Sequence, residues 1–284
     1  MRAEAYAKVN LSLRVRARDA SGRHPLQSLA QSIDWADRLA LEPASADAFT
    51  VTGLPAPADE SNLAWRAVAA ARAAAARPGP AALTLDKHIP LAAGLGGGSA
   101  DAAAALVLAG TRFGVGPADR DRLAPGLGAD VPFCLLGGTA WMEGFGERLT
   151  PLPPLAGFWL AVAVPPFEVS TGAAYSRWDD LDGPDGPAVS GRDLPPELRP
   201  YEPLVNDLVP AALSLAPGLG DWAADLRRAW GRALLMSGSG PAHFAFFPTA
   251  SEAAAAVAAG SGSRGTRACL PVPQGWRVPS GTLP

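Results

Sequence analysis

The sequence predicts an α+β protein of two domains, residues 1–152 and 153–284, and three observations support this fold class. Strand-like and helix-like patterns alternate through the first half of the chain. A second, shorter alternation follows towards the C-terminus. Between the two, the run Thr150-Pro-Leu-Pro-Pro154 interrupts both patterns. Because proline lacks the amide hydrogen that helices and strands use, this run favours a domain boundary.

The first half begins with strands. Alternating polar and apolar residues predict a strand over 5–16, and strand-like segments continue over 28–41. Ser61 follows two acidic residues and is predicted to open a long helix that ends near the turn Arg77-Pro-Gly-Pro80. The further elements expected here are a short strand at 83–85, a helix over 100–109 ending at Gly110, a helical segment at 120–123 interrupted from Gly126, and a strand at 139–142.

The second half alternates short strands with helices, which is typical of a small α+β unit. Its long loop is rich in proline, glycine and aspartate. The expected elements are a buried strand at 158–164, the loop at 179–200, a helix at 219–230, strands at 233–236 and 242–247, a helix at 251–259, a turn at 260–265, a strand at 267–271 and a tail from about Val278.

Composition excludes several classes of protein. The 284 residues are 48% hydrophobic, which allows a sizeable core. With 18% charged residues and a net charge of −3, the chain lacks the basic field of a nucleic-acid-binding protein, so we expect no nucleic-acid partner. Cys134 and Cys269 lack the spacing of a zinc site or a disulfide scaffold. We see no signal peptide and no run of about 18 apolar residues, and expect a cytoplasmic protein without a membrane partner. The sequence does not indicate an oligomeric state.

The most informative segment is Pro90-Leu-Ala-Ala-Gly-Leu-Gly-Gly-Gly-Ser99, here called the glycine loop. It lies between a predicted strand and a predicted helix. Glycine lets backbone amides approach an anion closely, and the first turn of a helix favours negative charge. Ser99 is expected to cap the helix, and Asp101 to lie in its first turn. The loop therefore predicts phosphate binding, although a turn that only reverses the chain is the alternative.

Three familiar phosphate-binding loops do not fit. The P-loop of nucleoside triphosphatases needs a lysine before its serine, and Gly98 stands there. The dinucleotide-binding fingerprint needs a third glycine where Ser99 stands. A protein kinase would carry His-Arg-Asp and Asp-Phe-Gly motifs, and the sequence has neither.

Four further segments are candidates for chemistry. Lys8 and Asn10 are two residues apart on a predicted strand, so they share a face that is either a cleft or an ordinary solvent face. Asp130 lies among small and apolar residues, and it is either a functional carboxylate or a residue that caps a helix or forms a turn. His24 could orient a ligand or be a loop histidine. The run Ser237-Gly-Ser-Gly-Pro241 suits a hairpin turn and could also bring amides to a phosphate.

These segments together resemble the GHMP small-molecule kinases. The matching segments, in order, are Ala7-Lys-Val-Asn-Leu11, Gly22-Arg-His-Pro-Leu26, the glycine loop with Ala100, Gly128-Ala-Asp-Val-Pro-Phe133, and Ser237-Gly-Ser-Gly-Pro241. The loop is similar to the family signature Pro-x-x-x-Gly-Leu-Gly-x-Ser-Ser-Ala. The resemblance extends from Ala5 to about Val278. It implies an N-terminal domain like ribosomal protein S5, which binds ATP and carries catalysis, and a ferredoxin-like α+β domain that binds substrate.

The resemblance also implies a reaction. The expected enzyme uses ATP and Mg²⁺ to phosphorylate a small molecule, at the 2-hydroxyl of a methylerythritol linked to cytidine diphosphate, on a route to isoprenoid precursors. A kinase of the homoserine or mevalonate type is the nearest alternative. A ligand sensor without catalysis is another, but a sensor need not keep both Lys8 and Asp130.

Roles follow for individual residues. Asp130 would take the hydroxyl proton, and Lys8 beside it would keep this carboxyl ionised and stabilise developing charge. His24 would bind the cytosine edge and Tyr175 would stack on the base. The positions implied for ATP are Asn62, Lys87, Pro90, Gly94, Leu95, Gly96, Gly97, Gly98, Ser99 and Ala100; those implied for the substrate are Asn10, Arg23, His24, Thr171 and Tyr175. No metal ligand is assigned.

Two positions depart from the family pattern. Arg23 stands where the family often has an aromatic residue that stacks on cytosine, and a guanidinium plane can also stack on a base. Gly98 replaces the first serine of the signature pair, so no hydroxyl there reaches metal or phosphate. We expect Asp101 to act as a first-turn acid rather than as its substitute.

Overall fold

A computed structural model describes residues 1–260 and 262–279. Within these ranges, seven strands form a large sheet in the order β13-β1-β2-β4-β3, and β5 and β6 extend it from β2. Only the β3–β4 pair is parallel. The strands are β1 (Arg2–Val15), β2 (Leu26–Pro43), β3 (Ala48–Gly53), β4 (Ala81–Lys87), β5 (Thr139–Gly144), β6 (Arg148–Leu152) and β13 (Trp276–Arg277).

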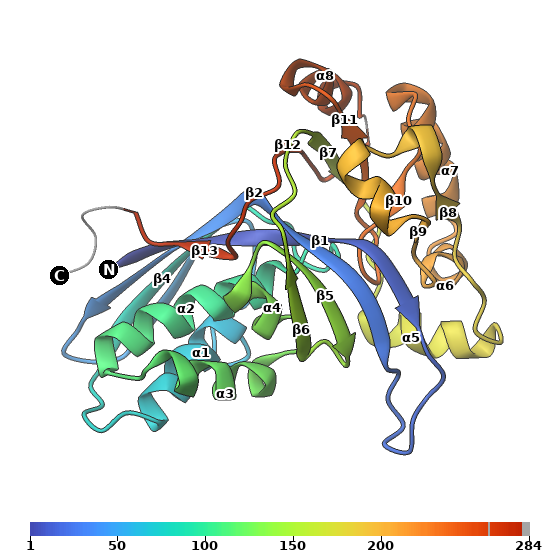
Figure 1. The fold of residues 1–284 in the computed structure, drawn as a ribbon. Coiled ribbons are helices and arrows are strands. Elements are labelled where there is room, and N and C mark those ends of the chain that lie inside the picture. The colour runs from blue at the N-terminus through green and yellow to red at the C-terminus, as the bar shows by residue number, and fades with distance from the viewer. Residues whose placement is uncertain (261, 280–284) are drawn as a thin grey trace.

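Helices cover one face of this sheet (Figure 1). They are α1 (Leu63–Ala73), α2 (Gly97–Phe113), α3 (Pro117–Leu127) and α4 (Val131–Leu136). Residues Ala100 to Ala105 of α2 are all buried, so this helix is enclosed between α1 and the sheet. Alanine combines the highest helix propensity with a side chain small enough for such close packing. This packing fixes the start of α2, where the glycine loop ends.

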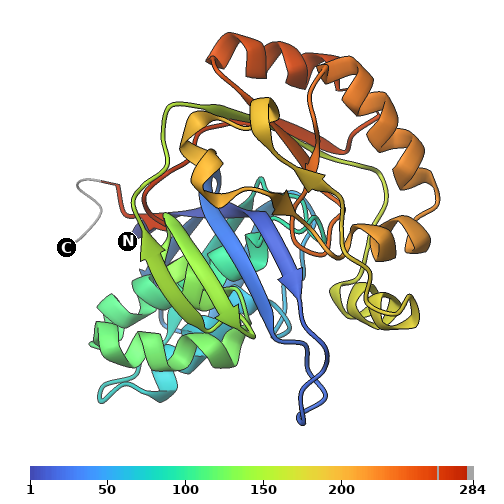
Figure 2. The same ribbon diagram turned by 45° about the vertical axis from the view of Figure 1, so that its right-hand side comes forward.

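A second, four-stranded sheet has the order β10-β11-β7-β12. Figure 2 shows some helices of this second half on the side of the sheet away from the large sheet, and others beside the hairpin that joins β1 to β2. The elements are β7 (Trp159–Val164), α5 (Thr171–Asp180), the short pair β8 (Ala188–Val189) and β9 (Leu204–Val205), α6 (Val209–Leu215), α7 (Gly218–Trp230), β10 (Leu235–Met236), β11 (His243–Phe247), α8 (Ala250–Ala259) and β12 (Gly265–Cys269). Two 3₁₀ turns lie at Gly191–Asp193 and Pro196–Tyr201.

The division of the chain at 152/153 stays a prediction. The second sheet uses only residues beyond that point, whereas β13 returns from the C-terminal side to pair with β1. One apolar core contains Val9 and Leu11 of β1 together with Leu160 of β7 and Phe244 of β11. Both sheets therefore contribute to the packing behind β1, the strand that carries Lys8 and Asn10.

The α+β class and most elements are confirmed, with several corrections. Gly96, not Ser99, caps α2, because its left-handed conformation (φ 66°) starts the helix earlier. Asp101 is therefore no first-turn acid. The helix ends at Gly114 rather than Gly110, and α3 runs past Gly126 to Leu127.

Three other segments of the second half need comment. The predicted loop at 179–200 contains β8 and begins inside α5. The predicted turn at 260–265 includes residue 261, and the predicted tail includes 280–284; these residues lie outside the described ranges. No helix of the described residues is long and apolar enough to cross a membrane.

Candidate active site

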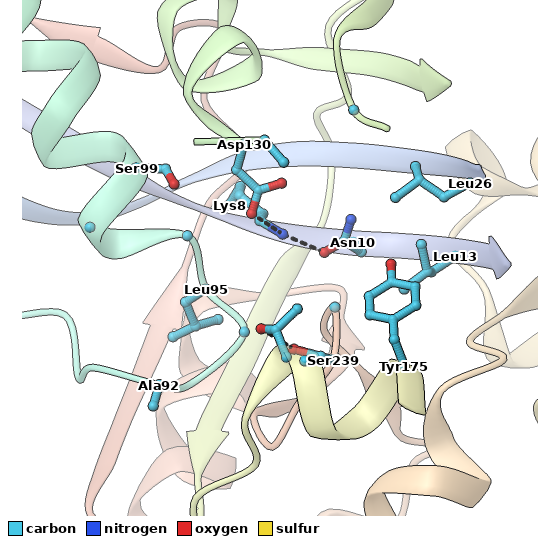
Figure 3. A pocket seen from close by; sticks show the side chains of 18 of the residues that line it. Lys8, Asn10, Leu13, Leu26, Ala92, Leu95, Ser99, Asp130, Tyr175 and Ser239 are labelled. Carbon is cyan, nitrogen blue, oxygen red and sulfur yellow. Dashed lines mark hydrogen bonds and ion pairs between the residues drawn. The ribbon is translucent and has the colours of Figure 1, made fainter. Parts of the chain in front are cut away.

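A cavity of about 730 Å³ lies where the glycine loop, β1, the β1–β2 hairpin and α5 meet. This volume is typical of a small-molecule site. Fourteen of the predicted site residues line it: Lys8, Asn10, Arg23, His24, Pro90, Gly94, Leu95, Gly96, Gly97, Gly98, Ser99, Asp130, Thr171 and Tyr175. Figure 3 shows Lys8, Asp130 and Ser99 at one end and Tyr175 further along β1.

Lys8, Asn10 and Asp130 form a chain of polar contacts at this end of the cavity (Figure 3). The Lys8 Nζ atom lies 3.1 Å from Asp130 Oδ2, and it donates a hydrogen bond of 2.6 Å to Asn10 Oδ1. Asn10 Nδ2 donates in turn to Ser28 Oγ at 2.7 Å. The Lys8 side chain is only 5% exposed, so this face of β1 is a cleft and not a solvent face. Asn10 thereby orients the ammonium group.

Asp130 precedes α4, at the position of a cap, but its carboxylate makes no capping hydrogen bond. The side chain is 32% exposed and points towards Lys8. A turn or cap role therefore does not account for this carboxylate. It is a hydrogen-bond acceptor that faces the cavity, where it can reach a hydroxyl group bound there, as a proton-accepting group must.

The glycine loop approaches its neighbours too closely for side chains. Gly94 has φ 78°, and a Cβ there would lie 2.2 Å from the Ser237 carbonyl oxygen. Gly96 has φ 66°, and a Cβ there would lie 2.9 Å from Lys8 Cγ. Both positions require glycine for conformation as well as for space.

Carbonyl groups of the loop accept hydrogen bonds from groups outside the loop. The Ala93 oxygen accepts from the Ala242 amide, the Gly94 oxygen from Ser237 Oγ, and the Leu95 oxygen from the Lys8 amide. Among the described residues, the amides of Gly94 to Ser99 donate to no other group. The loop therefore keeps its donors available at the start of α2, the end of a helix that favours an anion.

A buried cluster of charges lies beneath the loop. Lys87 Nζ lies 2.5 Å from Asp37 Oδ2 and 2.7 Å from Asp101 Oδ2, and all three side chains are nearly inaccessible. Burial lowers the pKa of Lys87, but Asp101 and Asp37 more than offset this, so the pKa is raised. Burial raises the pKa of Asp101 well above its usual range, although Lys87 opposes the shift. Asp101 therefore supports α2 and does not face the phosphate side.

The far end of the cavity is built from the β1–β2 hairpin and α5. The His24 ring lies against Tyr175, with 5.5 Å between centroids and 25° between planes. Its Nδ1 lies 2.9 Å from the Arg16 carbonyl oxygen and its Nε2 lies 3.1 Å from Asp179 Oδ2. Burial raises the pKa of Asp179, but Arg18 and His24 outweigh it and hold the pKa below its usual value.

Arg23 does not point freely into the cavity. Its guanidinium carbon lies 3.8 Å from the centroid of the Phe145 ring, a cation–π contact. Phe145 also lines the cavity. The flat guanidinium group is thus fixed beside His24, at the place where the family often has an aromatic ring.

Three predicted positions lie outside the lining. Asn62 caps α1 by accepting from the Ala64 amide, Lys87 belongs to the buried cluster, and Ala100 is buried in α2. Their assignment to nucleotide binding stays a prediction, and the structure gives each of them another role.

The sequence analysis missed other lining residues. Phe145 and Arg18 line the cavity, and Ser239 makes a 2.9 Å hydrogen bond with Thr171. Phe145 lies in a turn between two strands, where no sequence pattern distinguishes it. Ser239 belongs to the Ser-Gly-Ser motif, so this motif could have identified it as a site residue from the sequence.

The described residues hold no group of three or more histidine, cysteine or acidic side chains placed to bind a metal. At the glycine loop the lining offers two side-chain oxygen ligands, the Asp130 carboxylate and the Ser99 hydroxyl. This set fits a hard cation only if most of its ligands come from a bound phosphate or from water, as is common for Mg²⁺.

Comparisons with known proteins agree with this geometry. Residues 62–138 match the model of the GHMP kinases N-terminal domain. The chain is 40% identical over 255 residues to a 4-diphosphocytidyl-2-C-methyl-D-erythritol kinase of Moorella thermoacetica, covering 84% of this chain and 87% of that protein. It is 42% identical over 253 residues to the kinase of the same name from Jannaschia sp., covering 87% and 89%.

Solved structures show the same fold. A crystal structure of a 4-(cytidine 5'-diphospho)-2C-methyl-D-erythritol kinase matches with a TM-score of 0.79 and 37% identity, over 96% of this chain and 100% of that one. A homoserine kinase from Cytophaga hutchinsonii matches with a TM-score of 0.70 at 19% identity, over 98% and 96%, which supports the fold alone.

Proposed function

The chain belongs to the 4-diphosphocytidyl-2-C-methyl-D-erythritol kinases, a GHMP kinase family, and from this we propose how its own residues carry the reaction. It is an ATP-dependent small-molecule kinase. Its acceptor is the 2-hydroxyl of 4-(cytidine 5'-diphospho)-2-C-methyl-D-erythritol. The observation that carries the mechanism is the 3.1 Å pair of Lys8 and Asp130 beside the free amides of the glycine loop.

The transfer needs positioning and charge neutralisation more than covalent catalysis. The hydroxyl oxygen bonds to the γ-phosphorus while the bond from that phosphorus to the bridging oxygen of ADP breaks. ADP keeps the electron pair of this bond, and the hydroxyl proton passes to Asp130. Lys8 stabilises negative charge on the transferring group. The loop amides hold the phosphates in place.

Mg²⁺ would neutralise charge on the ATP phosphates. The side chain available to hold it is Ser99, because Asp130 takes the hydroxyl proton and Asp101 is committed to Lys87. We propose that phosphate and water oxygens complete its coordination.

The far end of the cavity supports a nucleotide-linked acceptor. Arg18, Arg23 and His24 bring cationic or polar donors to this end, although the chain as a whole has a net charge of −3. A diphosphate needs such local donors, whereas a small amino alcohol such as homoserine does not. Tyr175 and His24 add two stacked rings, which suit a base.

Direct transfer of phosphate tests the function. Purified protein would be incubated with γ-labelled ATP, Mg²⁺ and a panel of alcohols: the cytidine-diphosphate-linked methylerythritol, homoserine and mevalonate. We expect label only on the first. Label on either of the others would reject the assignment of substrate, and label on none would reject the kinase.

Replacing Gly96 by valine is expected to weaken ATP binding by at least tenfold. A Cβ at this position would lie 2.9 Å from Lys8 Cγ, and valine disfavours the left-handed conformation. Titration calorimetry with ATP–Mg²⁺ measures the effect. Gly231 also has positive φ, nothing lies within 4 Å of its Cβ position, and it does not line the cavity. Gly231→Val is the control for conformation alone, and an unchanged ATP affinity in Gly96→Val would reject the loop as the phosphate site.

Replacing Tyr175 by alanine is expected to raise the KM for the cytidine-linked substrate by about tenfold, because one base–aromatic stack contributes roughly 1–3 kcal/mol. The KM for ATP should stay within twofold. The His24 and Tyr175 centroids are 5.5 Å apart, less than the ~7 Å that a base between two rings requires, so the base would use the outer face of Tyr175 or separate the pair. Tyr175→Phe keeps the ring and should behave as wild type. An equal rise in KM for both substrates would argue against stacking.

A further inference from the structure

One guanidinium group reaches the glycine loop from the second sheet. Arg264 Nη2 donates to the Leu91 carbonyl oxygen at 2.7 Å and to the Ala92 carbonyl oxygen at 3.3 Å. These carbonyls directly precede the three that Ala242, Ser237 and Lys8 bind. The carbonyls of residues 91–95 are thus all bound by groups outside the loop.

Arg264 is itself held in place. Its amide donates to the Val164 carbonyl oxygen at 2.8 Å, and its Nε donates to the Pro165 carbonyl oxygen at 3.1 Å. Its Nη1 lies 3.3 Å from Glu168 Oε1. The side chain is 26% exposed, and the residue directly precedes β12, which pairs with β7. An arginine anchored at its backbone and along its guanidinium group can impose a position on its partners.

The loop needs an external restraint at this place. Ala92 has φ 49°, a left-handed conformation that a residue with a Cβ disfavours. Ala92 is exposed and lines the cavity. Without a partner for its carbonyl, the peptide that joins Ala92 to Ala93 would be free to rotate. The amides that follow would then lose their common direction.

We propose that Arg264 is a positioning residue for nucleotide binding, which holds residues 91 and 92 so that the amides of the glycine loop converge on the ATP phosphates. Arg264 does not line the cavity, so it would act through the loop. This inference rests on the proposed function only in that the ligand of the loop is ATP. The identity of the alcohol does not enter.

The test compares Arg264→Met with wild type. Methionine keeps the length and apolar character of the stem but donates nothing. We expect the KM and the Kd for ATP–Mg²⁺ to rise about tenfold, as the loss of hydrogen bonds to a charged donor implies, while the KM for the cytidine-linked alcohol stays within twofold. The melting temperature without nucleotide should change little, because water can reach the released carbonyls. Arg264→Lys, which cannot reproduce the paired bonds, should fall between the two.

Two matched controls separate positioning from general loosening. Glu168→Gln removes the charge of the exposed partner of Arg264 but keeps an oxygen that can accept from it, so this variant should bind ATP as wild type does. Arg232→Met removes another arginine–glutamate pair of the C-terminal half, the pair of Arg232 with Glu252, which makes no contact with the glycine loop. This variant should also bind ATP as wild type does. An ATP affinity of Arg264→Met within twofold of wild type would overturn the proposal, as would an equal rise in KM for ATP and alcohol.

The direct binding measurement keeps this test separate from that of the proposed function. Wild-type protein that bound ATP but phosphorylated no cytidine-linked alcohol would reject the proposed substrate, and the loss of ATP affinity in Arg264→Met would still support the positioning role. Wild-type protein that bound no ATP would overturn both.

Discussion

Replacing Asp130 by asparagine is expected to lower kcat by about 100- to 10,000-fold, the range that removal of a positioned proton acceptor produces. Asparagine has nearly the same shape, so Lys8 keeps an oxygen to contact, but the amide cannot take the hydroxyl proton. The KM for the acceptor should change little, and the Kd for ATP should remain within a few-fold, because the loop amides are untouched. Steady-state kinetics and calorimetric titration of ATP–Mg²⁺ measure the two effects.

A double-mutant cycle tests whether Asp130 and Lys8 act together. Lys8→Met alone should also reduce kcat strongly, because it removes the ammonium group 3.1 Å from Asp130 Oδ2. The effects on kcat of replacing two groups that act as one unit are not additive. The kcat of the double variant should therefore be little lower than that of the less active single variant. Asp185→Asn serves as the control, since Asp185 is an exposed aspartate that pairs with Arg14 away from the loop. Near-normal turnover of Asp130→Asn would remove this carboxylate from catalysis.

Local patterns were sufficient to predict much of this arrangement. The two-residue spacing of Lys8 and Asn10 placed them on one face of a strand, and the structure confirms a shared, buried face. The glycine cluster predicted a strand–loop–helix unit, which β4 and α2 form. These features depend on backbone geometry over a few residues, which local sequence determines.

The errors and omissions have a different origin. Ser99 was predicted as the cap of α2 because its side chain suits a cap, but the left-handed Gly96 starts the helix earlier. Asp101 was assigned to the first turn of the helix, whereas it lies beyond that turn and is bound in the interior by Lys87. The contacts of Arg264 with Leu91 and Ala92 join segments far apart in the chain. Single-sequence patterns contain no information on such pairings.

The buried cluster of Lys87, Asp37 and Asp101 is where the largest loss of stability should occur. One ammonium group lies between two carboxylates, and none of the three side chains is appreciably exposed. Asp37 also accepts from the amides of His88 and Ile89, so its charge is compensated by three donors. Asp101 has one bonded oxygen, and its other oxygen, Oδ1, has no hydrogen-bond partner among the described residues.

Replacing Lys87 by methionine is therefore expected to lower the free energy of unfolding by about 3–5 kcal/mol, because it leaves the buried Asp37 carboxylate without its counter-charge. Urea denaturation monitored by tryptophan fluorescence measures the change. Adding Asp37→Asn to Lys87→Met should recover part of the loss, since it removes the carboxylate left without a counter-charge. A loss below about 1 kcal/mol, the range of an exposed ion pair, would contradict the interpretation of Lys87 as the centre of a buried cluster.

The pH dependence of the free energy of unfolding of the single variant Asp101→Asn tests the protonation state of Asp101. Because burial raises the pKa of Asp101, the folded protein retains a proton on this group that the unfolded chain loses at lower pH. Its contribution to stability is therefore present at low pH and declines as the pH rises towards the folded-state pKa. Asp101→Asn does not titrate, so its free energy of unfolding should decline less than that of wild type between pH 5 and pH 9, a range chosen to span values well above the ordinary aspartate pKa of about 3.9. Parallel curves for the two proteins would show that Asp101 is ionised in the folded state throughout, and the cluster would then hold a net negative charge beneath the glycine loop.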